Sequence, residues 1–205
     1  MIIGLAGKMG SGKDYIAQKY IIPIVKKMGK EILQMSFADQ IKINVMTNHN
    51  VPYDEVFVKK TQQSRKLLQL EGTEKGRNVF GQDIWIKYFD AWSRVYSARG
   101  IDCIITTDIR FQNELVYIKK NNGIVIKVVA EERNKKRLTH ESGGDISVYN
   151  SLSKHSSECD LDDVDDEEYD IVVKNDEGQF DQHKFENELE SIIQKMLDKV
   201  VHNGL

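Results

Sequence analysis

Gly7, Gly12 and Lys13 stand in the spacing G-x-x-x-x-G-K, within the stretch GKMGSGKD. In this spacing, glycines let successive backbone N–H groups turn toward phosphate oxygens, and the lysine ammonium reaches the β and γ phosphates of a nucleotide. A short apolar run precedes the loop and a helical pattern follows it, which is the strand-to-helix context that the motif requires. The sequence therefore predicts a nucleotide phosphate site, with a helix N-terminus adding partial positive charge.

Asp14 occupies the position where this motif usually has the serine or threonine that contacts magnesium. A carboxylate can hold Mg²⁺ directly or through water. An acid in the first turn of a helix also stabilises that helix without any metal. Both interpretations of Asp14 stay open.

A charged pair, Asp108 and Arg110, follows the apolar stretch Ile101 to Thr107. Ligands of open α/β sheets bind at the carboxyl ends of the strands, so chemistry is expected at this position. Asp108 would receive magnesium or hold a substrate, and Arg110 would clamp a phosphate with two hydrogen bonds. The alternative is that the pair caps the next helix.

A basic and then glycine- and serine-rich stretch covers residues 131–157, between two expected strands. This composition suits a mobile lid, and Arg133 and Arg137 are its candidate arginines for closing over phosphates. A solvated cluster of surface charge is the alternative.

Two further cations are candidates for the acceptor side of the site. Lys42 lies within about one turn of a helix expected to start near Asp39, which is a plausible N-cap. A solvated lysine is an equally good interpretation of Lys42. Arg77 ends a polar stretch, Gly72 to Arg77, that is expected to form a turn.

The stretch Gln82 to Ala98 is rich in aromatic residues at helical spacing. A helix packed against a sheet explains this pattern better than a base-stacking platform does. Trp85, near the helix start, is kept as a candidate pocket wall, together with Phe37 at the end of the second expected strand.

Strands that alternate with helices predict a three-layer α/β/α domain with a mainly parallel five-stranded sheet. We expect one domain over residues 1–205, with the phosphate loop at 7–14, an acceptor-binding helical region at about 38–98 and the lid at about 131–157. The expected strands are 2–6, 31–37, 101–107, 124–129 and 169–173.

Composition limits the classes of partner. The 205 residues carry a net charge of -3, which argues against nucleic-acid binding driven by phosphate neutralisation. No stretch is apolar enough to predict a signal peptide or a membrane span. Cys103 and Cys159 form no disulfide framework, so we expect free thiols and a cytoplasmic location. The histidines show no zinc-ligand spacing.

The loop with its aspartate resembles that of the phage-type deoxynucleoside monophosphate kinases, in the P-loop nucleoside monophosphate kinase superfamily. Three more stretches are similar to that family's pattern, in the same order: Leu67 to Phe89, Ile105 to Leu115 followed by VIKVVA, and His155 to Asp176. Together they cover most of the chain.

This resemblance implies transfer of the γ-phosphoryl group of ATP to a deoxynucleoside 5′-monophosphate, with Mg²⁺. It implies a small-molecule substrate and no nucleic-acid or membrane partner. The implied location is the cytoplasm, which is the host's cytoplasm if the source is viral, and a homodimer remains possible. The implied roles are catalysis by Lys13, Arg110 and Arg137; ATP binding by Lys8, Gly10, Ser11, Gly12, Lys13, Asp14 and Arg133; acceptor binding by Phe37, Lys42, Arg77, Trp85, Asp108 and Arg110; and metal binding by Asp14 and Asp108.

Two alternatives remain. The animal phosphomevalonate kinases share a GKD loop, a D-x-R strand end and an S-E-x-x-L segment, but they are less similar across Leu67 to Phe89. A nucleotide-binding regulatory P-loop protein without turnover is the alternative of another class. Arginines at several acceptor-side positions favour a kinase, because a simple ATP binder does not need them.

Overall fold

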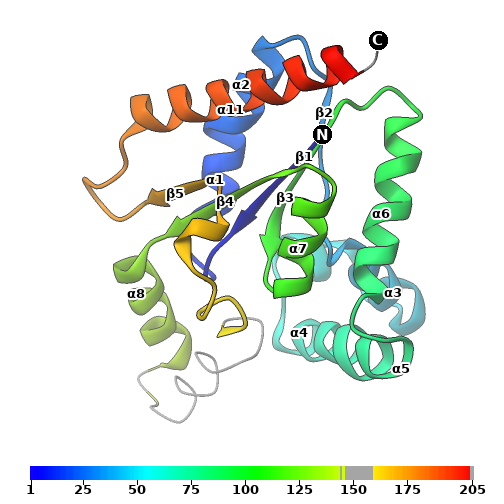
Figure 1. The fold of residues 1–205 in the computed structure, drawn as a ribbon. Coiled ribbons are helices and arrows are strands. Elements are labelled where there is room, and N and C mark those ends of the chain that lie inside the picture. The colour runs from blue at the N-terminus through cyan, green and yellow to red at the C-terminus, as the bar shows by residue number, and fades with distance from the viewer. Residues whose placement is uncertain (144, 146–158, 204–205) are drawn as a thin grey trace.

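The computed structural model describes residues 1–143, 145 and 159–203, and places helices on both faces of one sheet (Figure 1). The five strands are β1 (Ile2–Ala6), β2 (Ile32–Gln34), β3 (Cys103–Ile109), β4 (Ile124–Val129) and β5 (Ile171–Lys174). They lie in the order β2-β3-β1-β4-β5, and each of these neighbours pairs in parallel. The predicted three-layer α/β/α P-loop kinase fold is confirmed.

The helical elements described are α1 (Lys13–Ile16), α2 (Ile22–Lys27), α3 (Asp39–His49), α4 (Gln62–Gln69), α5 (Asn78–Phe80), α6 (Ile84–Ser97), α7 (Gln112–Lys120), α8 (Glu131–Ser142) and α11 (Gln182–Asn203), with π-helical segments η1 (Ala17–Ile21), η2 (Asp54–Val58) and η3 (Leu70–Arg77), and a short 3₁₀ turn, η4 (Asp166–Glu168). Within these ranges, no helix combines the length and apolar character that crossing a bilayer requires.

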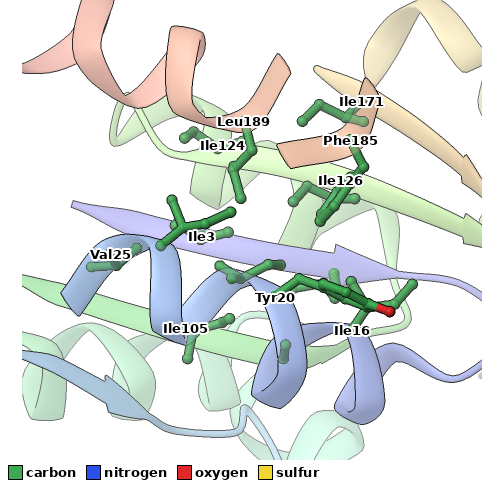
Figure 2. Packing of buried hydrophobic residues seen from close by; sticks show 14 of the residues in the cluster. Ile3, Ile16, Tyr20, Val25, Ile105, Ile124, Ile126, Ile171, Phe185 and Leu189 are labelled. Atoms are coloured by element: carbon green, nitrogen blue, oxygen red, sulfur yellow. The ribbon is translucent and has the colours of Figure 1, made fainter. Parts of the chain in front are cut away.

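The central strands are apolar on both faces because helices cover both sides of the sheet. Ile3 of β1 packs in the layer formed with α1, α2 and α11, where Figure 2 shows it among Val25, Ile124 and Leu189. The preceding residue, Ile2, belongs to the opposite layer, as the two-residue period of a strand requires.

The strand order sets the position of the site. β1 lies between β3 and β4, so the loop that follows it emerges in the middle of the carboxyl edge of the sheet. The ends of β3 and β4 flank that loop on either side. This is the edge at which open α/β sheets bind their ligands.

Some local predictions were wrong. Gly72 to Arg77 is not a turn, because η3 continues the helical path of α4 through Arg77. Asp39 is the first residue of α3 rather than its N-cap, and its carboxylate accepts a hydrogen bond from the Ser36 N–H over 2.8 Å.

The predicted lid can be followed only in part. Its first segment, residues 131–142, is the helix α8. Residues 144 and 146–157 of the predicted lid lie outside the described residues.

Candidate active site

The loop after β1 has a backbone that only glycine adopts easily. Gly7, Gly10 and Gly12 have φ values of 143°, 87° and 90°. A Cβ at Gly7 would lie 2.3 Å from the carbonyl oxygen of Val128, so a side chain there has no room. These glycines therefore shape a cradle lined by backbone, as the motif predicts.

Lys13 lies inside this cradle. Its side chain is 8% exposed, and Nζ donates hydrogen bonds to the carbonyls of Gly7 over 2.7 Å and Lys8 over 3.0 Å. The Ser11 hydroxyl is buried and has no hydrogen-bond partner within the described residues. Leaving a buried hydroxyl unsatisfied is costly, so this atom fits a phosphate oxygen as its partner.

Asn175, which sequence reasoning missed, directly follows the edge strand β5 and supports the phosphate loop. Its Nδ2 donates to the carbonyl of Ser11 over 2.7 Å, and its backbone N–H donates to Val129 over 2.7 Å. A Cβ at Gly12 would lie 2.3 Å from this Nδ2, which explains why position 12 holds glycine. Its position immediately after β5 was the available signal, because the strand-end rule that selected Asp108 applies there too.

The two predicted lid arginines lie against the loop. A Cβ at Gly10 would be 2.8 Å from Cδ of Arg137, and a Cβ at Gly12 would be 3.2 Å from Nη1 of Arg133. Both side chains project from α8, four residues apart and so on one face of the helix. The structure therefore brings these arginines to the predicted phosphate site.

Hydrogen bonds to the phosphate loop and to the segment after β5 hold α8 in this position. Asn134 donates from Nδ2 to the carbonyl of Met9 in the loop over 2.9 Å. The carboxylate of Asp176, next to Asn175, accepts from the backbone N–H groups of Glu132 and Arg133, each over 3.2 Å. The residues that follow β5 thus support both the loop and the arginine-bearing helix.

Asp14 lies at the edge of the loop with one oxygen fixed. Its Oδ1 accepts from the Thr107 hydroxyl over 2.5 Å and from Gln34 Nε2 over 3.3 Å. Its Oδ2 has no partner in the part of the chain that the structure describes. Within those residues, no three His, Cys, Asp or Glu side chains gather as a metal site. A carboxylate with one oxygen left over suits a hard cation such as Mg²⁺, so Asp14 would be the residue to hold it.

Asp108 fixes the loop between β2 and α3. Its Oδ1 accepts from the Phe37 N–H over 3.0 Å and the Thr106 hydroxyl over 2.7 Å. Its Oδ2 accepts from the Ala38 N–H over 3.1 Å and from the Ser36 hydroxyl. Asp108 therefore holds the loop just before α3, and none of these bonds goes to the helix that follows it in sequence, as the alternative interpretation expected. Its metal or substrate role stays a prediction.

Phe37 and Trp85 do not form an open pocket wall. Phe37 is 3% exposed and stacks on Phe89, with ring centroids 4.2 Å apart. Trp85 is also 3% exposed, and its indole N–H donates to the carbonyl of Gly72 over 2.8 Å. Both rings serve packing, as the interpretation of the aromatic helix favoured.

Arg77 is buried rather than open to a ligand. Its Nη2 lies 2.9 Å from Glu114 Oε1, and its guanidinium carbon lies 3.6 Å from the centre of the Phe111 ring. Its predicted direct contact with an acceptor phosphate therefore stays a prediction that this geometry does not favour.

Lys42 borders a group of cations. Its Nζ lies 2.8 Å from Asp39 Oδ1 and 4.8 Å from the centre of the Phe57 ring. Partial desolvation lowers the pKa of the nearby Lys60, and the charges of Lys42, Arg110 and Arg65 lower it further. Mutual repulsion of this kind is relieved when an anion binds among the cations.

Sequence reasoning missed two members of this group, Lys60 and Arg65. They flank the start of α4, where the Thr61 hydroxyl accepts from the Ser64 N–H over 3.1 Å as N-cap. An N-cap between two basic residues was the available signal. We call Lys42, Lys60, Arg65 and Arg110 the acceptor-side cations.

A cavity of about 570 Å³ extends beside the loop, and its lining includes Lys8, Arg110, Asn134 and Tyr169.

Lys8 forms an ion pair with Asp162, with Nζ and Oδ2 2.9 Å apart and both side chains about half exposed. Asp162 belongs to an acidic stretch, residues 160–170, whose charged side chains are mostly exposed. It makes further ion pairs, Lys127 with Asp166 and Lys119 with Glu168. Exposed pairs of this kind contribute little individually.

The cysteines agree with expectation. Cys103 and Cys159 are both free thiols, and burial raises the pKa of Cys103 to about 12. A thiol with so high a pKa is protonated at neutral pH and is a poor nucleophile.

Comparison with known proteins gives one informative relative. The chain is 28% identical over 147 residues to a protein of Acanthamoeba polyphaga mimivirus named "Putative deoxynucleotide monophosphate kinase", covering 62% of this chain and 73% of that protein. No family model matches the chain.

Among solved structures, similar chains include a dephospho-CoA kinase from Campylobacter jejuni, at 14% identity over 95% of this chain and 96% of that one with a TM-score of 0.45. A shikimate kinase from Acinetobacter baumannii is 14% identical over 100% of this chain and 94% of that one, with a TM-score of 0.43. The fold assignment does not depend on these scores, since the sheet order and the phosphate loop of the chain itself establish it. The chain thus has the P-loop kinase fold, and its resemblance to the deoxynucleoside monophosphate kinases is supported by a relative that carries that name.

Proposed function

We propose that this chain transfers the γ-phosphoryl group of ATP to a deoxynucleoside 5′-monophosphate, giving the diphosphate. The observation that carries the proposal is the convergence of cations from two directions. Lys13 lies inside the glycine cradle with Arg133 and Arg137 of α8 against it. Arg110 directly follows β3, and its charge, with those of Lys42 and Arg65, acts on Lys60. Positive charge on both sides suits the transfer of phosphate between two phosphorylated molecules.

In this proposal the loop and α8 bind the donor. Backbone N–H groups of the cradle and the Ser11 hydroxyl bind the ATP phosphates, while Lys13 and Arg137 neutralise charge on the migrating group. Asp14, oriented by Thr107, would hold Mg²⁺, which neutralises charge on the β and γ phosphates when bound. Phosphoryl transfer asks mainly for positioning and charge stabilisation, so no general base is required.

The acceptor-side cations bind the phosphate of the second substrate. This charge by itself does not select a nucleotide, because phosphomevalonate also carries a phosphate. The deoxynucleotide is favoured by the name of the mimivirus relative and by the motif pattern across Leu67 to Phe89. Phe57, whose ring lies beside Lys42, is a candidate for contact with a planar base.

An ADP-release assay with a panel of acceptors tests the proposal. We expect turnover with at least one of dTMP, dGMP or a pyrimidine deoxynucleotide analogue, slower use of the matching ribonucleotide, and none with phosphomevalonate. Lys13→Ala should lower the rate by more than about tenfold, because it removes a charged contact to the transition state. Turnover of phosphomevalonate with every deoxynucleotide refused would contradict the proposal. ATP binding without turnover of any acceptor would favour a regulatory protein.

A further inference from the structure

Glu114 is a buried carboxylate in the first turn of α7, with a side chain only 3% exposed. Its Oε1 accepts from Arg77 Nη2 over 2.9 Å. Its Oε2 accepts from the backbone N–H groups of Arg110 over 2.9 Å and Phe111 over 3.2 Å. One carboxylate therefore binds two separate parts of the molecule.

The two parts come from different sides of the site. Arg77 is the last residue of η3, within the helical region expected to cover the acceptor. Its side chain is 10% exposed, and it is held between the Glu114 carboxylate and the Phe111 ring. Arg110 comes directly after β3 and belongs to the acceptor-side cations. Glu114 thus links the helical region to the backbone of an acceptor-side arginine.

Helix capping explains the bond from the Phe111 N–H, because Phe111 is the N-cap of α7 and Glu114 its third residue, but capping does not explain the pairing with Arg77. A buried ion pair pays a large desolvation cost, and apolar residues of similar volume often serve stability equally well. What apolar residues cannot supply is a directional acceptor for the Arg110 N–H and a charge that attracts Arg77 to the same point. The geometry suits positioning, which is the main demand of phosphoryl transfer.

We infer that Glu114 is a positioning residue for the acceptor: it fixes the backbone of Arg110, and so the direction of the Arg110 side chain, relative to the helical region that ends at Arg77. This inference rests on the proposed function. It assigns Arg77 an indirect role in acceptor use, through Glu114, in place of the direct phosphate contact that the sequence suggested. The described bonds of Glu114 go to Arg77, Arg110 and Phe111 and none of them reaches the phosphate loop, so we expect the donor side to be independent of Glu114.

Steady-state kinetics of Glu114→Gln and Arg77→Met test this role in the full chain. Glutamine keeps the size of the side chain and loses the charge, whereas methionine keeps an apolar stem against Phe111 and loses the guanidinium. Each variant should raise the KM for the acceptor and lower kcat, by about tenfold in kcat/KM, while the KM for ATP stays within about twofold. The double variant should lose little more than either single variant, because both remove the same link. Arg77→Lys, which keeps the charge, should recover part of the loss.

Glu71→Gln is the matched control. Like Glu114, Glu71 is a buried carboxylate; it lies in η3 and is 4% exposed. Its Oε1 lies 2.9 Å from both His49 Nε2 and Lys75 Nζ. It makes no described bond to Arg110. This variant should lose a similar amount of stability on urea unfolding, with the acceptor KM changed by less than about twofold.

The outcomes separate the inference from the proposed function. If the wild type phosphorylates a deoxynucleotide, and Glu114→Gln shifts the KM for ATP and for the acceptor equally, only the inference fails. Losses in the two single variants that multiply in the double variant would overturn it as well. If the wild type uses a different phosphorylated acceptor, the proposed function fails. The inference is then tested with that acceptor: a raised acceptor KM with an unchanged KM for ATP in Glu114→Gln supports it, and equal shifts overturn it.

Discussion

Asn175 Nδ2 donates a hydrogen bond to the carbonyl oxygen of Ser11 over 2.7 Å, joining the end of β5 to a phosphate loop 164 residues away in the chain. The bond is buried, and the same amide fills the space beside Gly12 that a side chain would otherwise occupy. The shape of the donor cradle therefore depends on the far edge of the sheet as well as on the glycines.

Asn175→Ala should lower the free energy of unfolding by about 1–3 kcal/mol, because it leaves a buried carbonyl without its partner. It should also raise the KM for ATP more than the KM for the acceptor. Urea unfolding and steady-state kinetics measure the two effects. Asn113→Ala is the control, since that exposed amide bonds to Gln82 and Asp83 away from the loop. Equal effects of the two substitutions would contradict a special role for Asn175.

Asp14→Asn tests the assignment of the metal. If Asp14 helps to hold Mg²⁺, the magnesium concentration needed for half the maximal rate should rise more than the KM for ATP. The measurement is a magnesium titration at saturating ATP. An unchanged magnesium requirement with a lower melting temperature would favour the helix-dipole interpretation instead.

The arginines of α8 should differ in their effects from an ordinary surface charge. Arg137→Ala should lower kcat by about tenfold or more, since its side chain lies against Gly10 beside the expected γ-phosphate. Lys136→Ala, one position away on α8 and exposed, should change kcat by less than about twofold. Equal losses in both variants would indicate a general effect of positive charge on α8.

Glu114 should also make stability depend on pH. Burial, followed by the negative charge of Asp108, raises the pKa of Glu114 to about 7, and Arg77 and the N–H groups of Arg110 and Phe111 only partly oppose this shift. Because this pKa exceeds the ordinary value of 4.5, the folded state holds the proton more tightly than the unfolded state does. The resulting stabilisation is fully present below the ordinary value and is lost as the pH rises through about 7.

Urea unfolding of the wild type and Glu114→Gln between pH 5.5 and pH 8 measures this contribution. The free energy of unfolding of the wild type should fall relative to that of the variant as the pH rises. Curves that run parallel across this range would show that Glu114 stays ionised throughout.

Local patterns predicted the fold and the donor side of the site. The spacing of Gly7, Gly12 and Lys13 is read from adjacent residues, and alternation of strands and helices is enough to indicate a parallel sheet with a ligand edge. The basic start of residues 131–142 likewise indicated the arginines that the structure brings to the loop.

The acceptor side depended on contacts between distant segments, which no local pattern records. Nothing near Arg77 in the sequence indicates that Glu114, 37 residues later, pairs with it. Phe37 and Trp85 looked like pocket walls because an aromatic ring at a strand end or helix start is compatible with either a pocket or a core. Only the packing of α6 against the sheet decides between the two.

Tracing the γ-phosphate of ATP tests the central claim most directly. ATP labelled in its γ-phosphate is incubated with Mg²⁺, the protein and one acceptor at a time, either a deoxynucleoside monophosphate or phosphomevalonate, and the labelled products are separated and identified. The account predicts label in at least one deoxynucleoside diphosphate, with Lys13→Ala reducing it by more than about tenfold. Label recovered only in inorganic phosphate, or only in the product formed from phosphomevalonate, would contradict it.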